Sequence, residues 1–312
     1  MEIKQVARTI RDLAVVAGLV ATLGVAPGWA ALRVVAATPE LADIAKQVGG
    51  NRVSVSSIAK TDNDYHTTEA RPSQVVLISQ ASVVIKIGMD LDMWMDALLN
   101  AAGNPAVLPG GKGYVDSSVG IPKLEVPTAQ ITGASGDIHA YGNPHFYYDP
   151  VDAKIVAKNI LDGLKRVDVA DSPVFQGNYN AFTKEIDRRM EGWTKDLAPY
   201  KGQPVVIYHD SAIYFLERFG LKQFGTLEPK PGIPPSASHI SDLIQSMKAE
   251  GVKAVVVESI YPMKFTDLIT RETGARAVVV PYSVGALGTH SYFDLVDAWV
   301  QGYKKALSGG GS

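Results

Sequence analysis

The chain has 312 residues and contains no cysteine. A chain without cysteine forms no disulfide bonds and has no residue for attaching a lipid at an export cleavage site. It also lacks an excess of positive charge, because 30 lysines and arginines stand against 32 acidic residues with no block of like charge. This balance excludes the electrostatic footprint of a nucleic-acid-binding protein.

Short catalytic motifs are missing as well. The sequence contains no HExxH motif, no GxSxG nucleophile elbow, no GxGxxG fingerprint and no phosphate-binding P-loop. Nucleotide chemistry is therefore not expected. Hydrophobic residues make up 46% of the 312 residues, which is enough for two α/β domains that each have a core.

Residues 1–30 differ in composition from the rest of the chain. Three basic residues are followed by the uncharged run Leu13–Ala26 and by small residues up to Ala30. This order predicts a signal peptide cleaved after Ala30 and a periplasmic mature chain. The alternative is a retained membrane anchor, since residues 13–32 carry no charge, although a Pro-Gly pair interrupts them.

After residue 30, strand-like and helix-like patterns alternate in two blocks. Between the blocks, apolar residues recur at helical spacing over some 25 residues, which predicts one helix about 38 Å long. The members of this stripe are Tyr179, Phe182, Ile186, Met190, Trp193 and Leu197. The predicted fold is α/β, with two lobes that each hold a mostly parallel sheet flanked by helices and are joined by one long linker helix.

The predicted boundaries follow from these patterns. They are 1–30 for the signal peptide, 31–172 for the N-terminal lobe, 173–200 for the connecting helix, 201–307 for the C-terminal lobe and 308–312 for a flexible tail. Residues 109–144 show no periodicity and are expected to form a long surface loop. The chain is expected to be a monomer.

Three of the six histidines fall at predicted junctions between strands and helices. His209 ends a strand, His66 follows a strand through a polar loop, and His145 precedes a helix expected to begin at Asp149-Pro150. Glu258 also ends a strand. Ligands of open α/β sheets bind at the carboxyl ends of strands, and imidazole is a common metal ligand, so these residues are candidates for one metal site. Each histidine alone is more simply a structural residue, and position leaves both interpretations open.

Three motifs carry a family resemblance. They are YHTTEARPSQ, NPHFYYDP and YHDSAIYF, which are similar to PHDYEPTPSD, DPHIWLDP and SHDAFGYF. The latter belong to the zinc- and manganese-binding solute-binding proteins of ABC importers, the TroA-like class. The resemblance extends from about Arg33 to Leu307. It implies two α/β lobes joined by one long helix, capture of a metal ion in the cleft, and delivery to an ABC-type membrane permease.

The resemblance also implies a ligand set. It places metal ligands on His66, His145 and His209, but the aspartate of the family has no counterpart, because Val280-Pro281 stands there. Glu258 is the preferred substitute, as a strand-end carboxylate, with a water molecule or His290 as alternatives.

Three imidazoles with at most one carboxylate favour Zn²⁺ as the transported ion over Mn²⁺, which prefers oxygen ligands. The alternative function is a zinc-dependent hydrolase, since three histidines with an open water position describe a hydrolytic site, and Glu258 is the only evident base. The missing catalytic motifs favour a binding protein. The expected partners are the metal ion and the membrane permease.

The other histidines and the methionine cluster receive no metal role. His139 is the only histidine of the long loop, so that loop is not expected to scavenge metal. His239 lies at a helix start and His290 in a surface loop. The methionines that could serve as soft ligands for Cu⁺ are expected to pack instead; they are Met89, Met93 and Met95.

Overall fold

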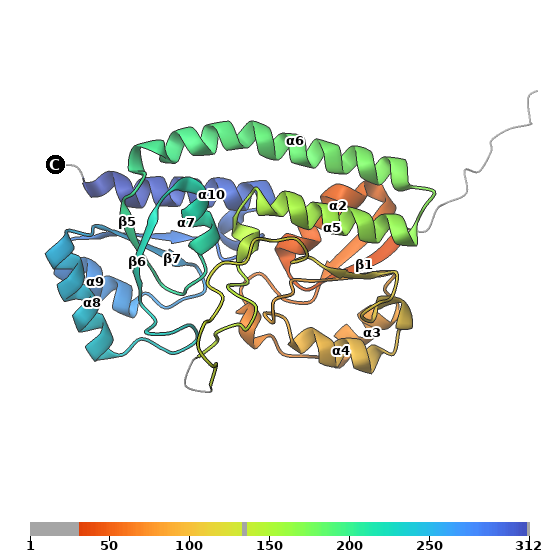
Figure 1. Ribbon diagram of the computed structural model, residues 1–312, viewed down its shortest axis with the longest axis horizontal. Coiled ribbons are helices and arrows are strands. Elements are labelled where there is room, and N and C mark those ends of the chain that lie inside the picture. The colour runs from red at the N-terminus through yellow and green to blue at the C-terminus, as the bar shows by residue number, and fades with distance from the viewer. Residues whose placement is uncertain (1–30, 133–135, 311–312) are drawn as a thin grey trace, which may run out of the picture. The chain divides into compact units, whose positions relative to one another are not determined.

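The computed structural model describes residues 31–132 and 136–310. The predicted signal peptide lies outside these residues. One compact unit, Ala31–Ser312, contains two parallel sheets with the same topology, β2–β1–β3–β4 and β6–β5–β7–β8 (Figure 1). The strands are β1 Leu32–Ala36, β2 Val53–Ser57, β3 Val83–Lys86, β4 Tyr114–Asp116, β5 Pro204–Ile207, β6 Lys222–Thr226, β7 Ala254–Glu258 and β8 Arg276–Val280.

Helices connect and cover these strands. The α-helices are α2 Pro39–Gly49, α3 Pro72–Ser79, α4 Trp94–Ala102, α5 Asp152–Val167, α6 Ser172–Leu197, α7 Ile213–Phe219, α8 Ala237–Glu250, α9 Lys264–Thr273 and α10 Tyr292–Leu307. Short 3-10 turns are η1 Gly50–Arg52, η2 Tyr65–Thr67, η3 Pro105–Val107, η5 Phe146–Tyr148, η6 Ala198–Tyr200, η7 Ala286–Gly288 and η8 Ser308–Gly310. Among the residues that the structure describes, no helix has both the length and the apolar character needed to cross a bilayer.

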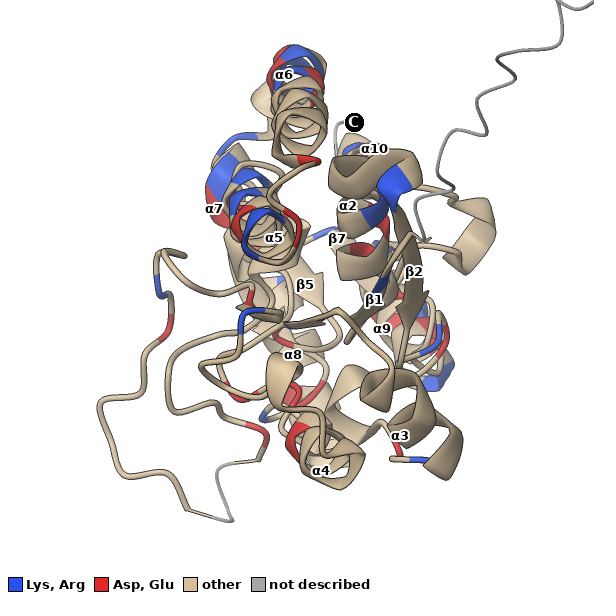
Figure 2. Cartoon of the chain, turned by 90° about the vertical axis from the view of Figure 1, so that its right-hand side faces the viewer, with Lys and Arg blue, Asp and Glu red and all other residues tan. Residues whose placement is uncertain are grey.

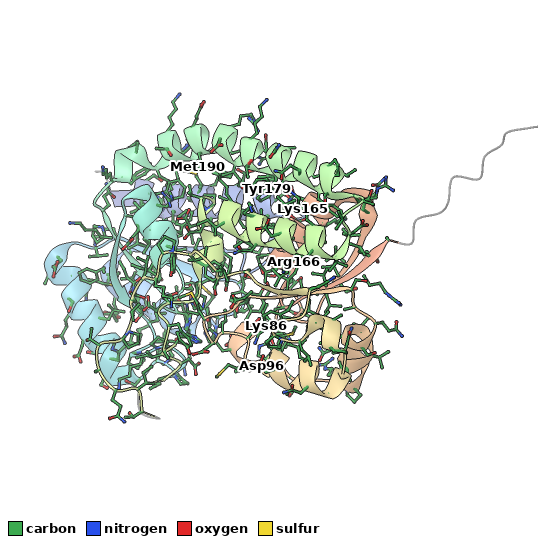
Figure 3. The ribbon with its side chains drawn as sticks, turned by 45° about the vertical axis from the view of Figure 1, so that its right-hand side comes forward. Lys86, Asp96, Lys165, Arg166, Tyr179 and Met190 are labelled. Carbon is green, nitrogen blue, oxygen red and sulfur yellow. The ribbon has the colours of Figure 1, made fainter. Side chains whose placement is uncertain are left out.

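The long helix α6 forms an outer layer over other helices. It packs on α2 and α5, which cover the first sheet, and on α10, which covers β7 and β8 of the second (Figure 1). Phe182, Ile186 and Trp193 are buried on its inner side, and Tyr179 and Met190 are half-buried against the same core (Figure 3). Both basic and acidic residues mark its solvent side (Figure 2).

The predicted fold class is therefore confirmed, with two parallel sheets flanked by helices and one long linker helix. The exact lobe boundaries stay a prediction. Packing does not separate the lobes, because one hydrophobic core contains side chains from both sheets, from β1 through β8. A second, smaller cluster packs around α8 and the facing side of β7.

A short strand, β4, lies inside the segment that was expected to be a loop. It pairs in parallel with β3, and Val115 is buried. Gly113 permits this approach, because a Cβ atom there would lie 2.0 Å from the carbonyl oxygen of Ser82. Three residues are too few to produce an alternating pattern, so the sequence alone did not reveal the strand.

Local geometry sets the starts of two helices. Helix α4 begins at Trp94, because Met89 and Asp90 have positive φ angles of 51° and 65° and turn the chain first. Helix α8 is capped by Ser236, whose hydroxyl accepts a hydrogen bond from the third helical N–H at 3.2 Å.

A buried carboxylate joins the two lobes. Glu40 of α2 is fully buried and accepts hydrogen bonds from the Tyr65 hydroxyl at 2.8 Å and from the backbone N–H of Val284 at 3.1 Å. The N–H of Tyr65 donates in turn to the hydroxyl of Tyr282 at 3.0 Å. Burial raises the pKa of Glu40 from 4.5 to about 7, although these hydrogen bonds oppose the shift.

This carboxyl should make stability depend on pH. Its pKa is higher in the folded than in the unfolded chain, so its contribution is complete below about pH 4.5 and is lost as the pH rises through about 7. The loss is up to roughly 3 kcal/mol. We expect the free energy of unfolding of the metal-free wild type to fall more between pH 5 and pH 8 than that of Glu40→Gln.

Urea unfolding at pH 5, 6.5 and 8 measures this difference. The matched control is Glu250→Gln, since Glu250 is an exposed glutamate at the end of α8. The control should follow the wild-type pH dependence, whereas parallel curves for the wild type and Glu40→Gln would contradict the assignment.

Candidate metal centre

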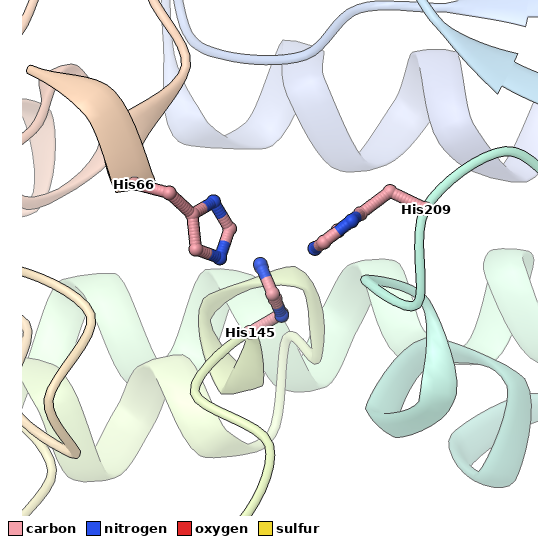
Figure 4. A group of neighbouring side chains, drawn as sticks. All are labelled: His66, His145 and His209. Carbon is pink, nitrogen blue, oxygen red and sulfur yellow. The ribbon is translucent and has the colours of Figure 1, made fainter. Parts of the chain in front are cut away.

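The structure brings three of the predicted ligands together. His66 lies in η2, His145 directly precedes η5, and His209 follows the end of β5. One ligand atom from each ring lies within 4.8 Å of those of the other two, and the rings point toward a common centre (Figure 4). The ring centroids are 5.0–5.4 Å apart. The cluster lies beyond the carboxyl ends of strands from both sheets, as the fold class predicts.

Each ring is oriented by an acceptor at its Nδ1 atom. This atom lies 2.8 Å from Asp64 Oδ1 in His66, 2.9 Å from Asn143 Oδ1 in His145 and 2.8 Å from Glu228 Oε2 in His209. An acceptor at Nδ1 places the ring proton there and leaves Nε2 with its lone pair. The same arrangement holds histidine ligands in metal sites.

The free nitrogens are buried. Nε2 of His66 and Nε2 of His209 have no hydrogen-bond partner, and the His145 and His209 side chains are almost completely enclosed. A buried lone pair without a donor is costly in a resting protein. Two such atoms facing one point are chemically suited to bind a cation.

The environments of the rings affect their protonation differently. Burial, followed by the neighbouring His209 and His66 rings, lowers the pKa of His145 well below 6.5. Burial would also lower the pKa of His209, but the hydrogen bond and charge of Glu228 outweigh it and raise that pKa. A proton therefore competes with a cation more strongly at His209 than at His145.

The helix after His145 begins later than predicted. Helix α5 starts at Asp152, although the Asp149 carboxylate still accepts a hydrogen bond from the N–H of Val151 at 2.7 Å. Asp149 also pairs with Arg218 of α7 at 2.8 Å. This ion pair holds the turn that carries His145 against the second lobe.

Glu258 is buried near the cluster but does not belong to the group of three. It accepts a short hydrogen bond from the Ser211 hydroxyl through Oε1, and its Oε2 is buried without a partner. Burial raises the pKa of Glu258, although the Ser211 hydrogen bond and the charge of His209 oppose this. The place of the missing aspartate is filled by Val280, which is buried, and Pro281, whose carbonyl accepts the Trp299 indole N–H.

The surroundings of the other histidines and of the three methionines show how these side chains are placed. His290 is exposed, and the Nε2–H of His239 donates a hydrogen bond to the carbonyl of Thr226 at 2.9 Å. Met89 and Met95 are buried in the core while Met93 is 61% exposed, so the three do not form a shared site. The packing role expected for them is correct for Met89 and Met95.

Sequence reasoning missed the orienting residues and one histidine. Asp64 and Asn143 each lie two residues before a candidate ligand, so this short spacing could have identified them from the sequence. Glu228 follows β6 and contacts His209 only in the folded chain, so no local pattern could have identified it. His139 of the long loop lies with its ring 5.4 Å from that of His66. Burial, with the charges of His66 and His209, lowers its pKa to about 4.

Comparison with known proteins agrees with this architecture. The family model "Zinc-uptake complex component A periplasmic" matches residues 34–306. A high-affinity zinc uptake system protein ZnuA of Brucella abortus is 29% identical over 136 residues, which are 44% of this chain and 41% of that protein. The chain thus spans about two fifths of that relative. The metal ABC transporter substrate-binding lipoprotein SloC of Streptococcus mutans is 24% identical over 78% of both chains.

Solved structures share the fold. A crystal structure of ZnuA superposes with a TM-score of 0.75 at 24% identity, covering 89% of this chain and 100% of that one. The solute-binding protein FpvC of Pseudomonas aeruginosa in complex with Mn²⁺ gives 0.77 at 19% identity, covering 90% and 100%. The family resemblance seen in the motifs is thereby confirmed, and the chain belongs to the family of periplasmic zinc-uptake complex component A proteins.

Proposed function

We propose that this chain is a periplasmic solute-binding protein that captures a divalent transition metal and delivers it to an ABC-type membrane permease. The observation that carries the proposal is the convergence of His66, His145 and His209, each oriented at Nδ1 by an acceptor. Buried imidazoles that are oriented by a hydrogen-bond acceptor at Nδ1 and present Nε2 to a common centre are the arrangement that holds a metal ion.

Zinc is the ion that this donor set favours. Imidazole nitrogen suits Zn²⁺, Ni²⁺ and Cu²⁺, whereas Mn²⁺ is a harder ion that prefers carboxylate and water oxygens. The three converging side chains offer nitrogen alone. Relatives named as zinc uptake and zinc-binding proteins support this choice. The solved structure of FpvC contains Mn²⁺, so the preference of this chain between Zn²⁺ and Mn²⁺ has to be measured.

The proposed ligands are His66, His145 and His209. Glu258, which the sequence predicts as the fourth ligand, is one candidate for the remaining position. The unpartnered Oε2 of Glu258 is compatible with that role, and the Ser211 hydroxyl already occupies its other oxygen. If Glu258 is not a ligand, its buried carboxylate supplies negative charge beside His209 that would offset the charge of the ion.

We infer capture and not catalysis. The matched relatives are named as uptake and substrate-binding proteins. The three rings are held in a buried cluster that joins both lobes, an arrangement suited to enclosing an ion. Hydrolysis of a simple ester by the zinc-loaded chain, lost on removing zinc, would support the alternative of a hydrolase instead.

The proposed partner is a membrane permease, and the proposed state of the chain is a monomer. Two names support this proposal: the family description calls its members periplasmic, and SloC is named as a substrate-binding lipoprotein of a metal ABC transporter. Export by residues 1–30, with cleavage after Ala30, is part of the proposal and lies outside the described residues.

Metal analysis tests the proposal. The purified mature chain, residues 31–312, is expected to hold one equivalent of Zn²⁺, measured by mass spectrometry, and to prefer Zn²⁺ when Zn²⁺ and Mn²⁺ compete at equal concentration. Absence of any stoichiometric metal after loading with either ion would overturn metal capture, and a preference for Mn²⁺ would overturn the assignment of zinc.

A further inference from the structure

A fourth histidine lies beside His66 of the three-histidine cluster. His139 lies in the loop before His145, its ring centroid is 5.4 Å from that of His66, and its Nε2 atom is buried without a hydrogen-bond partner. Nε2 of His66 and Nε2 of His209 are likewise buried without a hydrogen-bond partner. Three unpartnered imidazole nitrogens in one region are more than packing requires.

His139 lines two cavities that each border part of the cluster. One, of about 300 Å³, is lined by His139 together with His145 and His209. The other, of about 530 Å³, is lined by His139 together with His66 and Trp94. His139 therefore shares a cavity with each of the three rings.

The loop around His139 is fixed to both lobes. A hydrogen bond with the backbone of Asp90 holds the His139 ring on the first lobe, at the turn where Asp90 has a φ angle of 65°. On the second lobe, the N–H of Asp137 donates to the carbonyl of Pro231 at 2.8 Å, and the Asn143 amide donates to the carbonyl of Asp210 at 2.7 Å. The loop is therefore tied to both lobes, while the His139 ring itself lies outside the group of three whose ligand atoms are within 4.8 Å of one another and has to move closer to share an ion with them.

From this arrangement we propose that His139 is the fourth metal ligand, in place of the aspartate that this chain lacks. The inference rests on the proposed function, since it assigns one more ligand to the same ion. Glu258 is the competing candidate, but one of its oxygens is engaged by Ser211, and it does not border either cavity. His139 has a buried nitrogen without a hydrogen-bond partner and lines both cavities.

A site of four imidazoles differs from the family pattern in the charge of its ligands and in the metal ions that it prefers. Its ligands are neutral, so the charge of the ion is balanced by carboxylates outside the ligand set: Asp64 and Glu228 at Nδ1 atoms, and Glu258 beside His209. Four nitrogens exclude oxygen ligands, which selects Zn²⁺, Ni²⁺ and Cu²⁺ over Mn²⁺ more strongly than three nitrogens and a carboxylate would.

Nuclear magnetic resonance of the histidine rings tests the proposal directly, because the chain has only six histidines. The chain is labelled with ¹⁵N at histidine and loaded with ¹¹³Cd²⁺, and a ring nitrogen bonded to cadmium is split by the ¹¹³Cd nucleus. We expect splitting at His66, His139, His145 and His209, and none at His239 or His290. Splitting at the other three without His139 would overturn this inference and leave the proposed function intact. Splitting at none would overturn the proposed function itself.

Three variants give an independent measure. His139→Ala is expected to lower zinc affinity by roughly 10- to 100-fold or more, because loss even of an outer-shell partner of a ligand costs that much. Glu258→Gln should change affinity less than tenfold, and His290→Ala, which removes an exposed histidine, should leave it unchanged. A larger loss in Glu258→Gln than in His139→Ala would assign the fourth position to Glu258 and overturn the inference.

Discussion

Replacing His145 by alanine should weaken zinc binding by roughly 100-fold while the chain remains folded. Structural zinc sites gain about 10–16 kcal/mol from four ligands, so one ligand carries about 3 kcal/mol, or two factors of ten in Kd. The His145 ring is held by the side chain of Asn143 and lies at the cluster, whereas the tyrosines around it form the core. Competition with a chromophoric chelator measures the change in Kd.

The matched control for this variant is His290→Ala, which removes one exposed histidine outside the cluster and should bind zinc like the wild type. Far-ultraviolet circular dichroism of the metal-free proteins checks that both variants fold. Unchanged zinc affinity in a folded His145→Ala chain would show that the ion binds elsewhere.

Replacing Trp299 by alanine should cost about 3–5 kcal/mol of folding free energy, the range for a large aromatic side chain removed from a core. Trp299 of α10 is 1% exposed and stacks on Tyr148 of the first lobe with ring centroids 3.9 Å apart. Its indole N–H donates to the carbonyl of Pro281 at 2.8 Å. The substitution leaves that carbonyl unpaired in addition to opening a cavity.

Urea unfolding of the metal-free variant measures this loss, and the midpoint of thermal unfolding should fall by roughly 2–4 °C for each kcal/mol. Val169→Ala is the control, since Val169 is 76% exposed and its truncation should change stability by less than about 0.5 kcal/mol. A Trp299→Ala chain as stable as this control would show that the stacked pair does not hold the lobes together.

Much of the fold could be predicted because long elements leave long patterns. The stripe from Tyr179 to Leu197 extends over five turns of α6, and apolar runs mark β3, β5 and β7, which are buried on both faces of their sheets. A strand that depends on one neighbour was not predicted. The three residues of β4 form a strand only because β3 lies beside them.

The candidate site was predictable to the extent that its residues lie at junctions between strands and helices. His66, His145 and His209 were found in this way, with the family motifs, and the structure brings them together. Glu228 and His139 were not, because each meets the cluster through a contact between segments far apart in sequence. No local pattern records that the loop carrying His139 folds back over His66.

The continuous core described above limits how this chain can be divided. The lobes are separate in topology, yet Trp299 of one stacks on Tyr148 of the other, and Glu40 of the first accepts a hydrogen bond from Val284 of the second. Cutting the chain at α6 would expose these apolar and polar groups together. We therefore expect the two lobes to unfold together as one cooperative unit, and a fragment containing either sheet alone to be unstable.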